Sequence, residues 1–135
     1  MAFINWTDQL SVNIRQIDDQ HKKLVSIINT LFDAMSQGKA KDVLGKVFNE
    51  LIQYTKTHFQ NEERMMQQYS YPDFAAHKKE HDDLTKTAMD LQDKFTKGAV
   101  SLSIETSNFL KAWLTKHILG TDKKYSPFLN GKGVV

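Results

Sequence analysis

The chain of 135 residues contains no cysteine, and this absence narrows the chemistry open to the protein. Without cysteine there is no disulfide bond and no thiolate ligand, so any bound metal must be held by nitrogen and oxygen atoms. The lack of cysteine also suits a reducing compartment. Residues 1–8 contain no basic segment followed by an apolar one. We therefore predict no signal peptide and a cytoplasmic location.

Long apolar runs and concentrated positive charge are also missing. No stretch approaches the roughly 18 consecutive apolar residues that a membrane span requires, so we expect no transmembrane helix. The net charge is only +2 and the lysine pairs are scattered along the chain. Nucleic-acid-binding domains gather their basic residues into a patch or stripe. We therefore predict that the chain does not bind nucleic acid.

Proline is scarce, with only Pro72 and Pro127 present, and both are interpreted as breaks in the hydrophobic pattern. The content of 40% hydrophobic and 25% charged residues is that of an ordinary globular protein. A chain of 135 residues is long enough to bury a core of its own. We predict a single domain over residues 1–135, made of an arm (1–17), a bundle (18–122) and a tail (123–135).

Apolar residues recur three and four positions apart and predict four amphipathic helices. Their expected ranges are 18–37, about 40–69, about 73–98, and from near Ser101 or Ser103 to Gly120. Gly38 is expected to end the first helix, and Asp73 to cap the third. Because short connections make consecutive helices antiparallel, the predicted fold is all-α: an up-down-up-down four-helix bundle. The arm and residues 125–135 are expected to be irregular, with Phe128 and Leu129 packed against the bundle.

Histidine carries the main functional signal. All five histidines continue the apolar faces of predicted helices. Five independent placements on inward faces have a chance of roughly one in seventy if about three of seven positions face the core. In an antiparallel bundle the five rings would meet at one end, together with a glutamate four residues after His58 and an aspartate five residues after His117. The candidate metal ligands are His21, His58, Glu62, His77, His81, His117 and Asp122.

Seven ligands are too many for one tetrahedral zinc. The zinc-protease motif H-E-x-x-H and the repeated Glu-x-x-His of ferritin-like di-iron proteins are both absent. The set instead suits two adjacent first-row metals bridged by Glu62 and Asp122. If the imidazoles divide three and two and a solvent-derived oxygen also bridges, one metal has six ligands and the other has five. The second then keeps an open position for a small molecule. Residue types alone leave iron, zinc, copper and nickel as alternatives.

The spacing of His117 and Asp122 has a structural consequence. Over five residues a regular α-helix turns about 140° beyond a full turn, so these two side chains would not converge. We therefore predict an irregularity near Gly120, either a π-type widening or a helix end followed by a new turn.

Four segments together resemble the hemerythrin family, and especially its single-domain bacterial members, the bacteriohemerythrins. The segments are IDDQHKKL (17–24), HFQNEE (58–63), HKKEH (77–81) and WLTKHILGTD (113–122). The resemblance runs from about Trp6 to Leu129, with no departure at a ligand position. It implies one iron held by His77, His81 and His117, a second iron held by His21 and His58, and bridges formed by Glu62, Asp122 and an oxo or hydroxo group.

The resemblance also implies a function: reversible O2 binding at the five-coordinate iron, for O2 storage, transport or delivery, and no enzymatic activity. Trp113 and Leu114 are candidates for the wall of the O2 pocket, and ordinary core packing is compatible with that role. Beyond O2 itself, an O2-consuming enzyme is a candidate partner, and the oligomeric state is left open. Two alternatives remain: O2 or redox sensing through a separate partner, or a di-iron oxidase or peroxidase, which would need a substrate channel and an electron donor.

Overall fold

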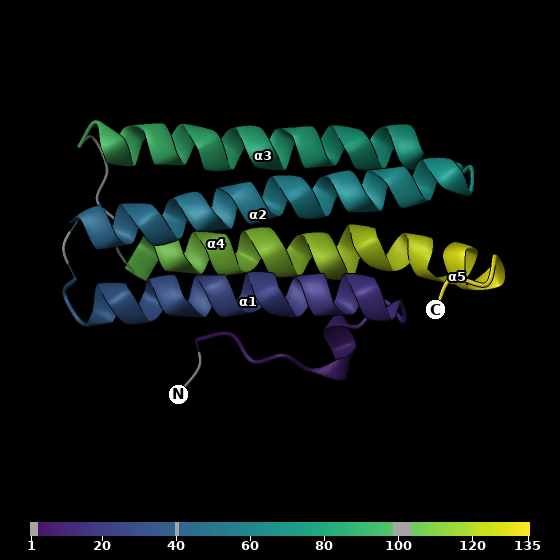
Figure 1. Cartoon of the computed structure of the whole chain (residues 1–135), viewed down its shortest axis with the longest axis horizontal. Coiled ribbons are helices and arrows are strands. Elements are labelled where there is room, and N and C mark those ends of the chain that lie inside the picture. Colours follow the sequence, from purple (N-terminus) through teal and green to yellow (C-terminus); the bar gives the residue numbers. More distant parts are fainter. Residues whose placement is uncertain (1–2, 40, 99–103) are drawn as a thin grey trace.

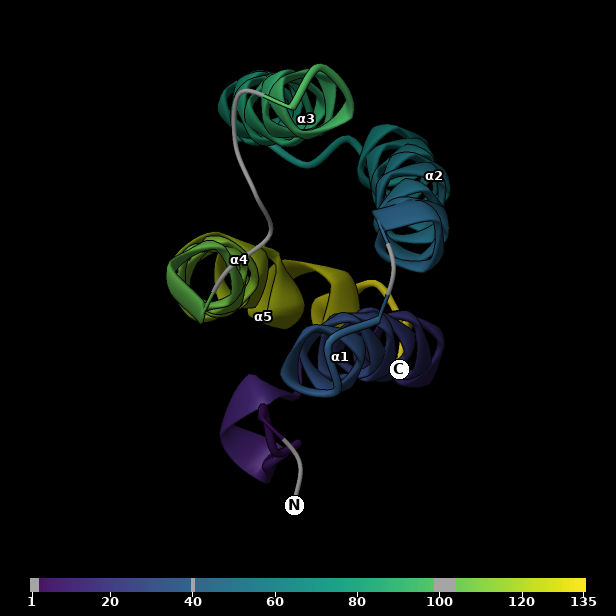
Figure 2. The ribbon, with the colours of Figure 1, turned by 90° about the vertical axis from the view of Figure 1, so that its left-hand side faces the viewer.

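A computed structural model describes residues 3–39, 41–98 and 104–135 of the chain. Within these residues the regular elements are all helical (Figure 1). They are η1 (Asp8–Leu10), α1 (Arg15–Ser36), α2 (Lys41–Gln68), α3 (Phe74–Thr96), α4 (Ile104–His117), the π-helical turn η2 (Ile118–Asp122) and α5 (Lys123–Gly131). Helices α1 to α4 run antiparallel in sequence order (Figure 1), and the view along their axes shows them grouped as a bundle (Figure 2). This confirms the up-down-up-down four-helix bundle. No helix among the described residues is both long and apolar enough to cross a bilayer.

The predicted helix ends are mostly accurate. Gly38 follows α1 with a φ of +68°, and its amide donates to Met35 while that of Lys39 donates to Ala34, both at 3.0 Å. This pair of bonds is the Schellman motif that glycine favours after a helix. Asp73 precedes α3 as predicted, although its side chain makes no capping hydrogen bond. The expected starts at position 40 and near Ser101 or Ser103 lie outside the described residues.

The arm is better anchored than its irregular sequence pattern suggests. It contains the short turn η1, and α1 begins at Arg15, three residues earlier than predicted. Its backbone is fixed by Asp18, whose carboxylate accepts hydrogen bonds from the Val12 amide at 2.8 Å and the Ser11 hydroxyl at 2.5 Å. Farther along, the ring of Phe3 stacks on that of Phe32 in α1 with centroids 4.2 Å apart. The arm therefore lies along α1 (Figure 1).

The prediction of an irregular C-terminal tail is wrong. Residues Lys123–Gly131 form α5, which contains Pro127. This proline was interpreted as a break in the pattern; within the helix it removes one backbone hydrogen bond and crowds the carbonyl of Lys123. The helix buries Tyr125 and Leu129, four residues apart, and this apolar face outweighs the missing bond. As predicted, Leu129 and Phe128 pack against the core.

Candidate metal centre

The seven candidate ligands lie together at one end of the bundle and are all buried. Each is at most 4% exposed: His21, His58, Glu62, His77, His81, His117 and Asp122. Each of the four bundle helices contributes at least one of them, and the turn η2 contributes Asp122. The predicted inward phase of all five histidines is confirmed.

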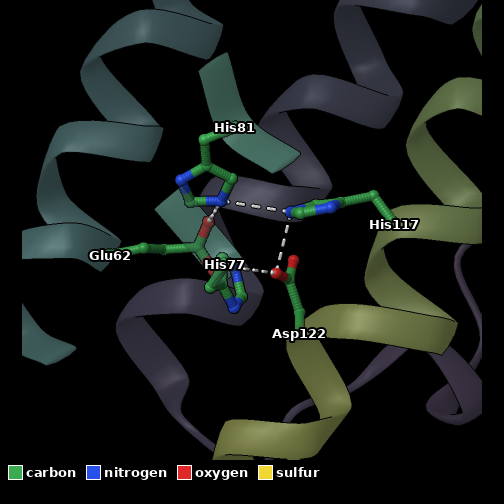
Figure 3. Close-up of side chains that lie close together, drawn as sticks. All are labelled: Glu62, His77, His81, His117 and Asp122. Atoms are coloured by element: carbon green, nitrogen blue, oxygen red, sulfur yellow. Dashed lines mark hydrogen bonds and ion pairs between the residues drawn. The ribbon is translucent and has the colours of Figure 1, made fainter. Parts of the chain in front are cut away.

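Their donor atoms form two overlapping groups. The first, here called the five-donor group, contains Glu62, His77, His81, His117 and Asp122 (Figure 3). The second, the four-donor group, contains His21, His58, Glu62 and Asp122. Within each group the donor atoms lie within 4.8 Å of one another. The two carboxylates belong to both groups and connect them.

Asp122 spans the two groups because of the local helix geometry. Its Oδ1 lies 3.0 Å from Nε2 of His77 and 2.9 Å from Nε2 of His117, while its Oδ2 lies 3.1 Å from Nε2 of His21. The amide of Lys123 donates to the carbonyl of Ile118, five residues earlier, so the turn is widened to π geometry. This confirms the predicted irregularity and selects its π form.

Glu62 also belongs to both groups, but only one of its carboxylate oxygens faces histidines. Its Oε1 is 2.9 Å from Nε2 of His58 and 3.4 Å from Nε2 of His81. Its Oε2 accepts a hydrogen bond from the hydroxyl of Tyr125 in α5. Burial and the negative charge of Glu62 both raise the pKa of Tyr125, so the phenol keeps its proton and acts as a donor. Sequence reasoning missed Tyr125 because it placed this residue in an irregular tail.

Hydrogen bonds from Nδ1, the ring nitrogen that faces away from the other ligands, decide the tautomer of two histidines. Nδ1–H of His81 donates to Glu63 at 2.9 Å, and Nδ1–H of His117 donates to Glu80 at 2.8 Å. A neutral imidazole that donates from Nδ1 carries a lone pair on Nε2. The Nε2 atoms of these two rings lie only 3.1 Å apart. Two lone pairs at this distance repel each other unless a proton or a cation lies between them.

Other buried donor atoms also lack hydrogen bonds. Among the described residues, the atoms without a hydrogen bond are Nδ1 and Nε2 of His21, Nε2 of His58 and His77, Oε1 of Glu62, and both carboxylate oxygens of Asp122. Apart from Nδ1 of His21, each of these atoms lies 2.9 to 3.1 Å from an oppositely charged or chargeable atom of the cluster. Leaving a buried polar atom unpaired costs about 1–3 kcal/mol, and more for a charged group. Metal ions would satisfy all of these atoms except Nδ1 of His21, since each histidine offers one nitrogen to the site. Imidazole with carboxylate suits first-row metals. The residues therefore fit a metal centre.

Without metal, protons take the place of the cations. Burial lowers the pKa of His117, but the negative charge of Asp122 outweighs it and raises the pKa to about 9. Burial raises the pKa of Asp122, yet the positive charge of His117 holds it well below its ordinary value. The pair is thus an imidazolium beside a carboxylate near neutral pH. A metal ion that binds here must displace the proton from His117.

A small cavity of about 10 Å³ lies beside the four-donor group. His21, His58, His117 and Asp122 form its polar side, and Leu24, Phe59, Leu84, Trp113 and Leu114 form its apolar wall. Trp113 is fixed by a hydrogen bond of 3.2 Å from Nε1 to the carbonyl of Leu84. The sequence analysis selected Trp113 and Leu114 and missed Leu24, Phe59 and Leu84. Leu24 could have been found because it lies one helical turn after His21.

Comparison with known proteins agrees with this geometry. Residues 12–129 match the family described as the hemerythrin HHE cation binding domain. The chain is 40% identical to a bacteriohemerythrin of Methylococcus capsulatus, over 96% of this chain and 99% of that protein. It is 34% identical to a bacteriohemerythrin of Stenotrophomonas maltophilia, over 93% and 81% of the two chains. A crystal structure of wild-type hemerythrin superposes with a TM-score of 0.88 at 40% identity, covering 93% of this chain and 97% of the other. This chain, with its buried cluster of histidines and carboxylates, belongs to the hemerythrin family.

Proposed function

We propose that the protein binds O2 reversibly at a pair of iron ions, for O2 storage, transport or delivery. The observation that carries the proposal is the arrangement of the donors: two groups share Glu62 and Asp122, and an apolar cavity lies beside the group that has fewer histidines. Such an arrangement suits two neighbouring ions, of which one is fully surrounded and the other has a position that can exchange its ligand.

In this proposal the ligands divide by group. His77, His81 and His117 hold one iron, and His21 and His58 hold the other. Glu62 and Asp122, which belong to both groups, would help to hold both ions. When bound, the pair of irons would supply one electron each to hold O2. The protein's own task is to fix these donors in place and to leave the free position on the side of the cavity.

The cavity wall favours binding over turnover. Its apolar residues, Trp113 and Leu114 among them, exclude water from the free position. The cavity holds about one molecule the size of water, so an organic substrate has no room beside the donors. We therefore propose that the protein is a binding protein and not an oxidase.

Anaerobic reconstitution tests the proposal. Metal-free protein is loaded with ferrous iron, analysed for metal, and then exposed to air and returned to argon while its visible absorption is recorded. We expect two irons per chain and an absorption band that appears with O2 and disappears without it. One metal per chain, predominant binding of zinc, or a spectrum that does not return would contradict the proposal. Sustained O2 consumption with excess ascorbate, above that of the iron-free protein, would indicate an oxidase instead.

A further inference from the structure

The two donor groups differ in the hydrogen-bond partners of the Nδ1 atoms of their histidines. In the five-donor group, two rings donate from Nδ1 to carboxylates: His81 to Glu63 and His117 to Glu80. In the four-donor group, Nδ1 of His58 pairs with the neutral amide oxygen of Gln20 at 2.5 Å. Nδ1 of His21 is buried and has no hydrogen-bond partner within the described part of the chain. Carboxylates therefore support one group, and a single amide supports the other.

This difference affects the strength of the metal ligands. A carboxylate that accepts a hydrogen bond from a ligand histidine fixes the ring orientation and makes the other nitrogen a stronger donor. Hydrogen bonds to an ionised acceptor are roughly twice as strong as those between neutral groups. An amide oxygen such as that of Gln20 gives a smaller effect. A ring without an outer partner among the described residues, such as His21, has no hydrogen bond at Nδ1 that fixes its orientation from outside the group.

Glu80 has an additional role in the geometry. Its carboxylate also accepts a hydrogen bond from the hydroxyl of Thr121, at 2.7 Å to Oε2 and 2.8 Å to Oε1. Thr121 lies in the π-helical turn, directly before Asp122. From helix α3, Glu80 therefore holds both the ring of His117 and the backbone segment that carries Asp122. Its side chain is 40% exposed, so a change there leaves no cavity in the core.

Glu63 acts from the other side of the group. It lies on α2 next to Glu62, and its side chain is 18% exposed. The ammonium of Lys78 lies 3.7 Å from its Oε1, while Oε2 accepts the bond from His81. Lys78 therefore lies beside Oε1 and leaves Oε2, the oxygen that faces the ring, free for His81.

We propose that Glu63 and Glu80 are positioning residues that make the five-donor position bind its metal more tightly, so that the two positions fill in a fixed order. The five-donor position fills first and anchors Glu62 and Asp122. The four-donor position, beside the cavity, fills second on a bridge that is already formed. This inference rests on the ligand assignment of the proposed function and adds an order of assembly to it.

Stepwise metal titration tests the order. Metal-free protein is titrated anaerobically with cobalt(II) against a competing chelator, and the dissociation constants of the two equivalents are determined separately. We expect two steps at least about tenfold apart. His77→Ala, in the five-donor group alone, should abolish the tight step, and His21→Ala, in the four-donor group alone, should remove the weak one. Thermal unfolding of the metal-free variants verifies that each is folded.

Two substitutions at the outer partners separate positioning from a general structural role. Glu80→Gln and Glu63→Gln should each weaken the first step by about 10- to 100-fold and leave the second step unchanged once the first position is filled. The reciprocal change, Gln20→Glu, puts a carboxylate against His58 and should strengthen the second step. Glu50→Gln is the matched control, because Glu50 is an exposed residue of α2 whose carboxylate lies 4.0 Å from the ammonium of the equally exposed Lys23.

The outcomes distinguish the inference from the proposed function. A single indistinguishable step, a tight step that survives His77→Ala, or equal weakening of both steps by Glu80→Gln would overturn the inference. Two ordered steps in a protein that shows no reversible response to O2 would leave the inference standing and refute the function. A wild-type chain that binds no cobalt at all would refute both.

Discussion

The two ends of the bundle are stabilised by different interactions. At the ligand end, buried charged and polar groups meet, and Asp122 is completely inaccessible to solvent. At the far end, where α1 and α3 terminate, the rings of Phe48 and Phe95 stack with centroids 6.4 Å apart. Among the described residues at that end, polar contacts are exposed, such as that from Nζ of Lys41 to the carbonyl of Thr96 at 3.3 Å.

This difference shows that the ligand end, unlike the far end, depends on bound protons or metal ions for its stability. Apolar residues at the far end gain stability from burial alone. The ligand end instead buries donor atoms whose desolvation must be offset by protons or metal ions. Substitutions of the same kind should therefore have different consequences at the two ends, and three pairs of substitutions test this. A fourth comparison, between metal-free and metal-loaded protein, tests the part played by protons at the ligand end.

The largest difference is expected for metal content. His77→Ala removes a proposed ligand near the start of α3, whereas Lys94→Ala changes a surface residue near the end of the same helix. We expect His77→Ala to lose most of the iron of the five-donor position and Lys94→Ala to keep two irons per chain, as measured by elemental analysis. A full complement of iron in both variants would show that His77 is not a ligand.

The second-largest difference is expected when a buried leucine is truncated to alanine at each end of the bundle. Leu114→Ala and Leu31→Ala each create a core cavity, since both residues are almost completely buried, and each should cost on the order of 2–5 kcal/mol of unfolding free energy. Only Leu114→Ala should admit water beside the donors and speed the loss of bound O2 to the inactive ferric form, with iron content unchanged. Urea unfolding and stopped-flow autoxidation measure the two effects. Equal oxidation rates would make Leu114 an ordinary core residue.

The pH dependence of stability should differ between the metal-free and the metal-loaded protein. In the metal-free protein the pKa of His117 is raised from 6.5 to about 9. Its contribution is therefore fully present below pH 6.5 and is lost as pH rises through 9. We expect urea unfolding to show falling stability between these values without metal, and not with metal, because a coordinated imidazole carries no such proton. Metal-free stability that rises across this window would contradict the raised pKa.

The smallest difference is expected from single polar contacts. Asp18→Ala removes two hydrogen bonds that anchor the arm at the ligand end and should cost about 1–3 kcal/mol. Lys41→Ala removes an exposed hydrogen bond to Thr96 and a cation–π contact with the ring of Phe95 at 5.5 Å, and should cost no more than about 1 kcal/mol. Thermal unfolding measures both. Equal costs would mean that Asp18 does not hold the arm.

Much of the fold and the candidate site followed from sequence periodicity. The apolar stripes gave the four helices, and the positions of the five histidines on those stripes gave their inward phase. The five-residue spacing of His117 and Asp122 cannot be met by an α-helix, which is why the irregularity could be predicted. That the seven residues bind iron stays a prediction.

The remaining features depend on contacts that periodicity does not encode. Gln20, Glu63 and Glu80 lie on the flanks of their helices, where the pattern assigns them to solvent, and only the packing of neighbouring helices brings them to the outer ring nitrogens. Helix α5 was missed because Pro127 was given more weight than the apolar spacing of Tyr125 and Leu129. In both cases tertiary contacts outweighed a local signal.

The π-helical turn η2 also sets the rotational phase of everything that follows it. One additional residue in a helix turns all later side chains by about 100°. Beyond the turn, the hydroxyl of Ser126 donates to the carbonyl of Val12 at 2.5 Å. The side-chain amide of Asn130 donates to the backbone carbonyl of Asn13 at 3.1 Å. Deletion of the exposed Gly120 would let the helix return to α geometry and rotate both donors away from the arm. The length of this turn therefore determines whether α5 can form the hydrogen bonds from Ser126 and Asn130 to the N-terminal arm.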